Sequence, residues 1–172
     1  MAKKSIKINV IDHRMLDGGK DVEDVTSVVL PNLENPTTEI NTSGLALNLE
    51  IPDTTKFNAA EYSIAHNNGN NCNLLQTPGL HTQEFRTVRQ KYSVGKTAIE
   101  KESVKYRLTG MHKSTETGTI ETGNPWGSTE KYSLVRYEEI VGGKTVKLVD
   151  GPNNIIKING KDFSGDVQKL LN

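Results

Sequence analysis

The fold is decided by a stretch near the end of the chain. Residues 131–137 read KYSLVRY, 145–149 read TVKLV and 155–158 read IIKI, and the pairs Gly142-Gly143 and Asn159-Gly160 interrupt these runs. Short runs rich in β-branched and aromatic residues predict strands. Gly-Gly and Asn-Gly supply the positive φ angles that two-residue hairpin turns need. The stretch therefore predicts an antiparallel meander. Because no catalytic motif accompanies it, it is typical of a building block rather than an enzyme.

Further strands are predicted along the rest of the chain. Alternating apolar and polar residues indicate strands, and they occupy residues 3–11, 22–30, 45–51, 57–65, 84–94 and 103–113. The turn Asp17-Gly18-Gly19 separates the first two strands, and residues 72–77 are predicted to form one short helix. The expected class is mainly β. It is a single domain over residues 1–172, an antiparallel β-barrel or sandwich with long projecting hairpins.

Composition limits the function. The chain has 172 residues, with 21 Lys and Arg against 21 Asp and Glu, so its formal net charge is zero. This balance argues against a nucleic-acid binder that relies on a strong positive field. Only 34% of the residues are hydrophobic. So low a content predicts a thin sheet with one polar face, or extensive solvated loops.

The ends and the cysteine content indicate where the protein resides. Cys72 is the single cysteine, which excludes an intrachain disulfide and a cysteine-based zinc site. The start of the chain shows no signal peptide, and no run of about 20 apolar residues predicts a membrane span. We expect a protein that stays in the cytoplasm unless it leaves by lysis or as part of a particle.

Candidate chemistry is sparse. Gly95-Lys96-Thr97 and Gly143-Lys144-Thr145 resemble the end of a phosphate loop, but the glycine required five residues earlier is Gln90 or Glu138. Both are predicted to be hairpin turns. The four histidines, His13, His66, His81 and His112, show no paired ligand spacing and are predicted to be solvated. The sequence thus predicts no catalytic residue, no metal site and no cofactor.

Two long polar segments are the candidate contact loops. Residues 32–43 carry Pro36 and three threonines, and residues 114–128 are rich in glycine and threonine and contain Pro125-Trp126. Polar loops of this length in a small domain are usually functional or disordered. Trp126 is interpreted as a loop anchor or a subunit contact rather than a stacking platform for a ligand.

The strand pattern resembles the major tail tube protein of contractile phage tails over most of the chain. Near the start, Lys7-Ile8-Asn9-Val10 leads through Asp17-Gly18-Gly19 to a valine-rich strand that closes in Leu30-Pro31-Asn32-Leu33. Near the end, the meander closes with a late Asn159-Gly160, as in that family. The chain departs from the family in having only Gly44 between residues 36 and 44, and in a shorter central helix.

The resemblance implies a homo-oligomer. Six copies would form a ring, and the rings would stack into a tube in the virion tail or in a tailocin particle, after assembly in the host bacterial cytoplasm. Each copy would give two hairpins to an inner barrel of about 24 strands, with a bore of roughly 35–40 Å from strand spacing and tilt. The implied partners are the sheath, tape-measure, baseplate and terminator proteins, with DNA only in transit and no membrane.

Two inner hairpins are hypothesised within this scheme. Residues 39–51 would pair with residues 57–65, which points Ala46, Asn48 and Glu50 toward the lumen. Residues 84–94 would pair with residues 103–113. The basic side chains of that second hairpin, Arg89, Lys91, Lys105 and Arg107, would then need Glu84, Glu102 or neighbouring copies to offset them. A bore that passes DNA should not hold its phosphates.

Ring stacking is assigned to the first polar loop. Its candidate residues are Leu33, Glu34, Thr38, Glu39 and Asn41, and Trp126 in the second loop is the other candidate contact. Shortening residues 34–42 should leave a folded subunit that no longer elongates.

Several alternatives remain open. The ring protein of a type VI secretion system and a headless phage-tail bacteriocin share the tube architecture. A monomeric β-sandwich that binds carbohydrate or acts as an adhesin would need a cluster of exposed aromatic residues, whereas Trp126 is the only tryptophan.

Overall fold

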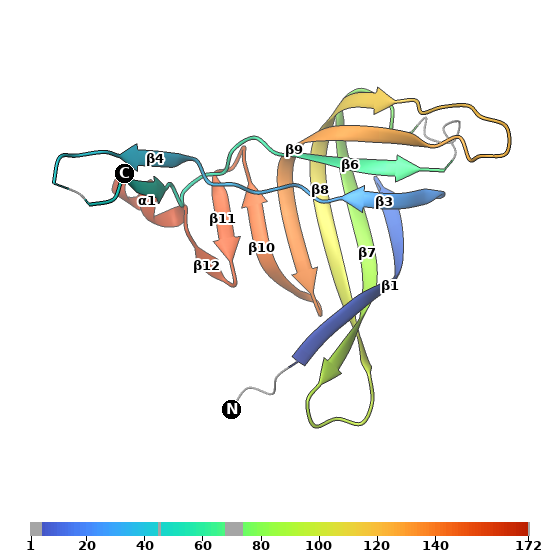
Figure 1. Cartoon of the computed structure of the whole chain (residues 1–172), viewed down its shortest axis with the longest axis horizontal. Helices are drawn as coiled ribbons and strands as arrows, with labels where there is room; N and C mark the ends of the chain where they lie inside the picture. Colours follow the sequence, from blue (N-terminus) through green and yellow to red (C-terminus); the bar gives the residue numbers. More distant parts are fainter. Residues whose placement is uncertain (1–4, 45, 68–73, 172) are drawn as a thin grey trace.

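The computed structural model describes residues 5–44, 46–67 and 74–171, and it is mainly β with antiparallel pairing (Figure 1). The strands are β1 (Ser5–Asp17), β2 (Lys20–Val22), β3 (Val25–Val29), β4 (Thr37–Ile40), β5 (Leu49–Pro52), β6 (Glu61–His66), β7 (Leu80–Ser93), β8 (Glu100–Glu116), β9 (Ser128–Val141), β10 (Lys144–Asp150), β11 (Ile155–Ile158) and β12 (Lys161–Asp162). One helix, α1 (Gly165–Leu171), follows them. The predicted mainly β class is confirmed.

The main sheet runs in the order β12-β11-β10-β9-β8-β7-β1-β2. Strand β9 is its branch point, because β8 pairs along one edge while two strands share the other. Residues 128–133 of β9 pair with β6, and residues 136–141 pair with β10. Strand β6 also pairs with β3. The sheet therefore splits at the middle of β9, and β3 and β6 form a second layer over β1, β7 and β8.

The predicted turns are confirmed in their backbone geometry. The pairs Gly18-Gly19, Gly142-Gly143 and Asn159-Gly160 all have positive φ at both residues. These angles match the right-handed twist of the strands that each turn joins. The closing meander of β9, β10 and β11 and the hairpin of β7 and β8 form as predicted.

The core lies between the two layers. Its largest buried side chains come from β1, β6, β7, β8 and β9: Met15, Tyr62, Ile64, Phe85, Leu108, Tyr132 and Tyr137. Leu75, from the turn that precedes β7, joins them. The rings of Tyr62 and Tyr132 stack with centroids 5.1 Å apart. This cluster is small, as the low hydrophobic content predicts.

The structure is not closed into a barrel, and of the two predicted forms it is the sandwich. Strand β1 pairs with β7 and β2, whereas β3 pairs only with β6. A side-chain hydrogen bond crosses between β1 and β3, where His13 Nε2 lies 3.1 Å from the Val25 carbonyl oxygen. A groove of about 300 Å³ lies along this opening, lined by Val10, Val28 and Phe85 among others. Both strands thus present unpaired backbone.

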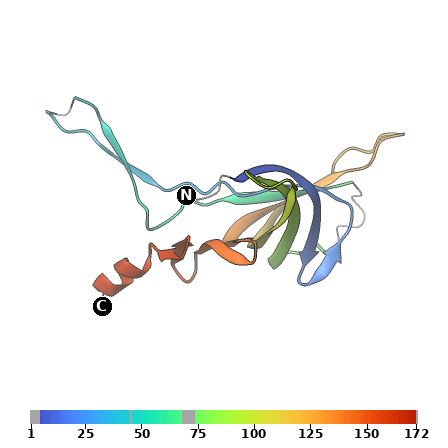
Figure 2. The same ribbon diagram turned by 90° about the horizontal axis from the view of Figure 1, so that it is seen from below.

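Strands β4 and β5 form a separate two-stranded hairpin, which projects from the body (Figures 1 and 2). The hypothesised pairing of residues 39–51 with residues 57–65 is wrong. Pairing β5 with β4 leaves β6 free to pair with β9, where Tyr62 and Ile64 become fully buried. Of the described part of the predicted strand 45–51, only residues 49–51 are extended, as part of β5, and residue 45 lies outside the described residues.

The helix forms at a different place from the one predicted. Residues 72–73 lie outside the described part of the chain, and Leu74–Gln76 form a turn rather than a helix. The helix is α1, where Asp162 Oδ1 accepts backbone N–H groups of Ser164 at 3.0 Å and of Gly165 at 2.9 Å. These bonds lower the pKa of Asp162. An acidic residue that caps unpaired N–H groups before a helix is the ordinary start signal.

Candidate assembly surfaces

The β4–β5 hairpin, called the arm here (residues 36–53), has two different faces. Its register pairs Thr38 with Ile51, Glu39 with Glu50 and Ile40 with Leu49. Directly opposed residues share a face of the pair. Glu39 and Glu50 therefore lie together on one face, and Ile40, Leu49 and Ile51 lie on the other. All of these side chains are exposed, so the arm presents an acidic face and an apolar face to its surroundings.

The base of the arm is fixed to the body. The Asp53 backbone N–H donates to the Pro36 carbonyl oxygen at 2.8 Å, and Asn35 Nδ2 donates to the carbonyl oxygens of Asp53 and Lys56. Asp53 Oδ1 accepts hydrogen bonds from the Thr55 hydroxyl and backbone N–H, and these lower the Asp53 pKa. The arm therefore leaves the body in a defined direction.

The residues predicted for ring stacking divide between body and arm. Leu33 is half-buried and packs against the core, while the exposed Glu34 accepts a hydrogen bond from Asn32 Nδ2 at 2.8 Å. Thr38, Glu39 and Asn41 are exposed on the arm. Their role in stacking stays a prediction.

The residues predicted to line the lumen lie on the same arm. Ala46, Asn48 and Glu50 are all exposed, and Asn48 Nδ2 donates to Glu39 at 3.2 Å. Since the strand pairing behind this assignment is wrong, the two predicted surfaces are neighbours on one hairpin. No observation relates them to a lumen, so the assignment stays a prediction.

The outer end of the β7–β8 hairpin projects in another direction from the arm (Figure 1). We call residues 89–102, with the adjoining residues 5–8 of β1, the distal hairpin; the register pairs Ile6 with Tyr92 and Lys7 with Lys91. Glu102 lies within 4 Å of three cations, Lys7, Arg89 and Lys91, with the shortest contact 2.7 Å to Arg89. Burial opposes ionisation of Glu102, but the hydrogen bond and charge of Arg89 and the two lysines together lower its pKa.

The distal hairpin also exposes large apolar side chains. Ile6, Ile8, Tyr92, Val94 and Ile99 are each between 38% and 58% exposed. On β8 the apolar side chains face the core, because Val104 and Leu108 are buried. On β7 the alternation runs the other way: Thr87, Arg89 and Lys91 share the core side, whereas Val88 and Tyr92 point outward. A monomer with exposed apolar residues on an extended hairpin is unusual and indicates a contact surface.

The basic side chains of this hairpin are offset as the sequence requires. Glu84 contacts Lys105 at 3.3 Å and Arg107 at 3.2 Å on the outward face, and Arg107 also contacts Glu138 at 3.1 Å. Burial opposes ionisation of Glu84, but hydrogen bonds from Arg86, Arg107 and Lys105 outweigh it and lower its pKa. Lys105 and Arg107 therefore lie on the opposite face from Arg89 and Lys91, each pair with its own glutamate.

The second polar loop, residues 117–127, extends beyond β8 and β9. Trp126 is half-buried, and its indole N–H donates to the Thr117 carbonyl oxygen at 2.7 Å. The positive φ of Gly118 brings its backbone against Gly127, where a Cβ atom would lie 1.7 Å from the Gly127 oxygen. Trp126 is thus an anchor of its own loop, and a subunit contact through it stays a prediction. Ile120, at 77% exposed, is the apolar side chain that the loop presents.

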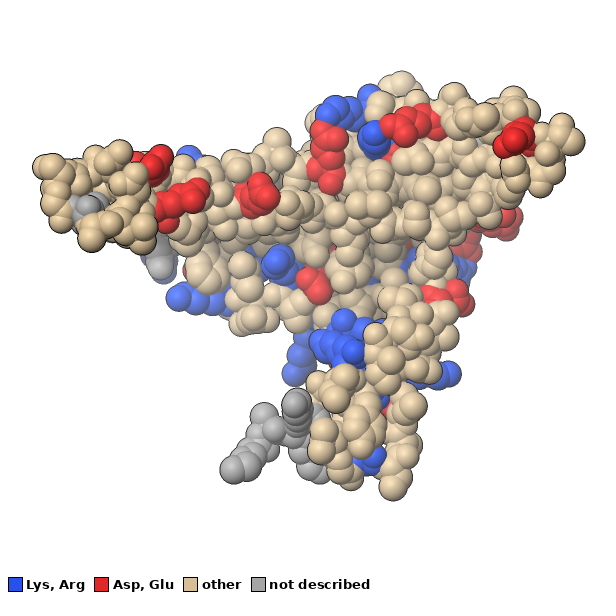
Figure 3. All heavy atoms as spheres, in the orientation of Figure 1, with Lys and Arg blue, Asp and Glu red and all other residues tan. Residues whose placement is uncertain are grey.

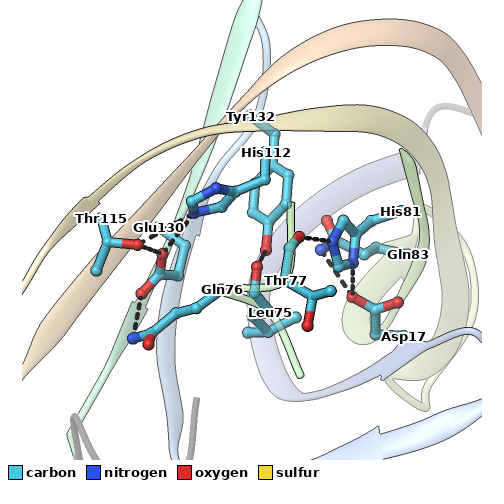
Figure 4. A network of polar contacts seen from close by, with 10 residues as sticks. All are labelled: Asp17, Leu75, Gln76, Thr77, His81, Gln83, His112, Thr115, Glu130 and Tyr132. Atoms are coloured by element: carbon cyan, nitrogen blue, oxygen red, sulfur yellow. Dashed lines mark hydrogen bonds and ion pairs between the residues drawn. The ribbon is translucent and has the colours of Figure 1, made fainter. Parts of the chain in front are cut away.

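The end of the core nearest this loop contains a buried polar network, which Figure 4 shows. Glu130 is fully buried and accepts hydrogen bonds from Gln76 and Thr115, and its Oε2 lies 3.0 Å from His112 Nε2. The Tyr132 hydroxyl donates to the Leu75 carbonyl oxygen at 2.7 Å. The network joins β8 and β9 to the turn that precedes β7.

A second histidine pair lies on the other side of Tyr132. His81 Nδ1 is 2.9 Å from Asp17 Oδ2, and His81 Nε2 is 2.7 Å from the Thr77 carbonyl oxygen. Gln83 also donates to Asp17. Both ring nitrogens of His81 thus lie within hydrogen-bond distance of an oxygen atom.

The prediction of solvated histidines is therefore wrong for His66 and His81, which are 2% and 8% exposed, and for the half-buried His112; it is confirmed only for His13. His66 has no hydrogen-bond partner for either ring nitrogen among the described residues, and burial lowers its pKa. The polar stretches around these histidines suggested solvent because the strand register that turns them inward is not visible in the local sequence.

Two further features were searched in the described residues. No group of three or more His, Cys, Asp and Glu side chains converges there on a possible metal position. In the same part of the chain, no helix has the length and apolar character to cross a membrane.

Charge is distributed unevenly over the surface, as Figure 3 shows: acidic residues lie along the arm, and basic residues gather around the outer part of the β7–β8 hairpin. Open strand edges, two projecting hairpins and exposed apolar side chains define a class of protein, the β-structured subunit that assembles with further chains.

The particular family follows from the sequence. The sequence model of the phage tail tube protein FII family matches residues 13–171, and the chain belongs to this family. The protein is thus a structural component of a phage tail. A search of curated proteins found no match.

Proposed function

We propose that this protein forms the inner tube of a contractile phage tail or of a tailocin. Six copies close into a ring, and rings stack into a hollow conduit through which DNA or protein is delivered. The proposal rests on family membership together with a β-structure in which β1 and β3 have unpaired edges. Unpaired strand edges are an aggregation hazard in a monomer, whereas in a closed ring neighbouring copies pair them.

The arm supports the stacking part of the proposal. A two-stranded hairpin by itself is marginally stable in water. The arm nevertheless leaves the body from a fixed base and exposes Ile40, Leu49 and Ile51 on one face. A projecting element of this kind gains most of its stability when a second copy covers it.

The proposed partners follow from the place of a tube in a tail. The sheath protein surrounds the tube, a tape-measure protein sets its length, and baseplate and terminator proteins occupy its two ends. DNA passes through the bore without being held. Assembly takes place in the host cytoplasm, and the virion tail is the final location.

Negative-stain microscopy of the purified protein, together with its mass at increasing concentration, tests this function. We expect rings and hollow tubes with a bore of roughly 35–40 Å, the value set by strand spacing and tilt in a barrel of about 24 strands. A chain that keeps the mass of one copy at every concentration, with and without other tail components, would exclude the proposed tube.

A further inference from the structure

The neutral total charge of the chain conceals two projecting regions of opposite sign. The arm, residues 36–53, contains Glu39, Glu50 and Asp53 and neither lysine nor arginine. In the distal hairpin, residues 5–8 and 89–102, the cations outnumber the carboxylates. The cations are Lys7, Arg89, Lys91, Lys96 and Lys101, and the carboxylates are Glu100 and Glu102.

The acidic face of the arm lacks a cation. Glu39 and Glu50 are directly opposed across the β4–β5 pair, and like charges in this position destabilise a sheet. Neither carboxylate forms an ion pair with another described residue; they accept hydrogen bonds only from Asn48 and Thr37. A cation supplied from outside the subunit would relieve this repulsion.

The distal hairpin has the complementary excess. Its carboxylates are already in use, because Glu102 serves three cations and Glu100 is paired with Lys96 and accepts from Ser93. Lys101 is exposed and forms no ion pair within the described residues. Both regions also expose apolar side chains, with Ile40, Leu49 and Ile51 on the arm and Tyr92, Val94 and Ile99 on the distal hairpin.

We infer that the arm of one copy docks on the distal hairpin of a neighbouring copy. The acidic face of the arm, with Glu39 and Glu50, meets Lys96 and Lys101 of the second copy. This inference rests on the proposed function and adds to it the receiving surface for the arm. Opposite charges across the contact set its partner and register.

A charge swap tests the contact. The first variant is Glu39→Lys with Glu50→Lys, and the second is Lys96→Glu with Lys101→Glu. Each alone should raise the protein concentration needed for tube formation by about tenfold or more, because like charges would then face each other. The two double substitutions combined in one chain should restore assembly, since the pairs are regenerated with exchanged sign.

A matched control separates site from net charge. Lys20→Glu with Lys144→Glu makes the same charge change as the second variant, at two exposed residues that begin β2 and β10 outside both regions, and it should assemble like the wild type. Thermal unfolding of all variants should remain close to wild type, which removes misfolding as an explanation. In mixtures, Asn48→Cys in one copy and Lys101→Cys in another, both with Cys72→Ser, should cross-link.

The outcomes are distinguishable. The inference would be overturned if both charge-reversal variants formed tubes at the wild-type concentration, or if the combined variant did not recover assembly. Neither result would contradict the tube itself. If the Lys96→Glu, Lys101→Glu variant assembled normally but bound duplex DNA less well than the wild type, the distal hairpin would be assigned to DNA binding instead. Wild-type protein that never assembles, together with cysteine variants that never cross-link, would overturn both the contact and the proposed function.

Discussion

Two sets of glutamates show how differently the body and the arm are built. Glu130 is fully buried in the body, and Gln76, Thr115 and His112 all lie within hydrogen-bond distance of its carboxylate. Glu39 and Glu50 are exposed on the arm, face each other and have no cation within the described subunit. The buried glutamate of the body is therefore satisfied within one chain, whereas we propose that the glutamates of the arm find their cations on a second chain.

The largest effect should come from removing the arm. Replacing residues 38–51 with an Asn-Gly turn keeps the hydrogen bond from the Asp53 N–H to Pro36 that closes the base. We expect a folded subunit with wild-type circular dichroism that forms no tubes in electron micrographs. This variant is cleaner than shortening residues 34–42, which would leave β5 without its partner. Normal tubes from the chain without the arm would contradict the role of the arm in assembly.

The second effect concerns the body. Glu130→Ala leaves His112, Thr115 and Gln76 without their common acceptor, so we expect a loss of about 3 kcal/mol in the free energy of unfolding. Denaturant titration measures it. The control, Glu61→Ala, breaks an exposed ion pair with Lys113 and should cost less than about 1 kcal/mol. Equal losses in the two variants would mean that the buried network is not what holds this end of the core.

A smaller effect is expected when the hydroxyl groups of the two stacked tyrosines are removed one at a time, and its size should differ between them. Tyr132→Phe removes the hydroxyl that donates to Leu75, and we expect a cost of about 1 kcal/mol. The Tyr62 hydroxyl is buried without a partner among the described residues, so Tyr62→Phe should be neutral or stabilising. Burial also raises the pKa of Tyr62 far above its ordinary value. A larger loss for Tyr62→Phe than for Tyr132→Phe in the same titration would contradict the assigned hydrogen bonds.

The smallest effect is a pH dependence of the body. Burial lowers the pKa of His66, with the charges of Glu130 and Asp24 opposing. As the pH falls through the ordinary histidine value of about 6.5, the unfolded chain binds a proton that the folded chain does not, so stability decreases. Unfolding measured at pH 7 and pH 5 should show a smaller loss in His66→Gln than in the wild type. The exposed His13→Gln should retain the wild-type loss; equal losses in all three proteins would exclude His66 as the cause.

Local sequence patterns predicted the body of the fold well. The pairs Gly18-Gly19, Gly142-Gly143 and Asn159-Gly160 fix the turns on which three hairpins depend. The alternation over residues 103–113 also predicts a strand that the structure contains as the centre of β8, with Val104 and Leu108 buried. These signals are short-range, and nothing distant in the chain overrides them.

Long-range pairing could not be read in the same way. Residues 45–51 alternate like a buried strand, yet Leu47 and Leu49 are exposed, because the arm is a separate two-stranded hairpin that projects from the body. The branch of β9 between β6 and β10, and the inward turn of His66 and His81, depend on register between distant strands. The sequence names Glu39 as a stacking residue, which stays a prediction, and it does not single out the basic distal hairpin. Its signal was the lack of lysine and arginine between residues 21 and 55 and their excess between residues 86 and 113.

Amide hydrogen exchange compared between dilute single copies and assembled tubes tests most directly whether neighbouring copies complete the arm and the open edges. We predict rapid exchange at Thr37–Ile40, Leu49–Pro52 and the first half of β1 in single copies, and strong protection of the same segments in tubes. Strands β8 and β9 should be protected in both states. Arm amides that exchange equally fast before and after assembly would contradict this account.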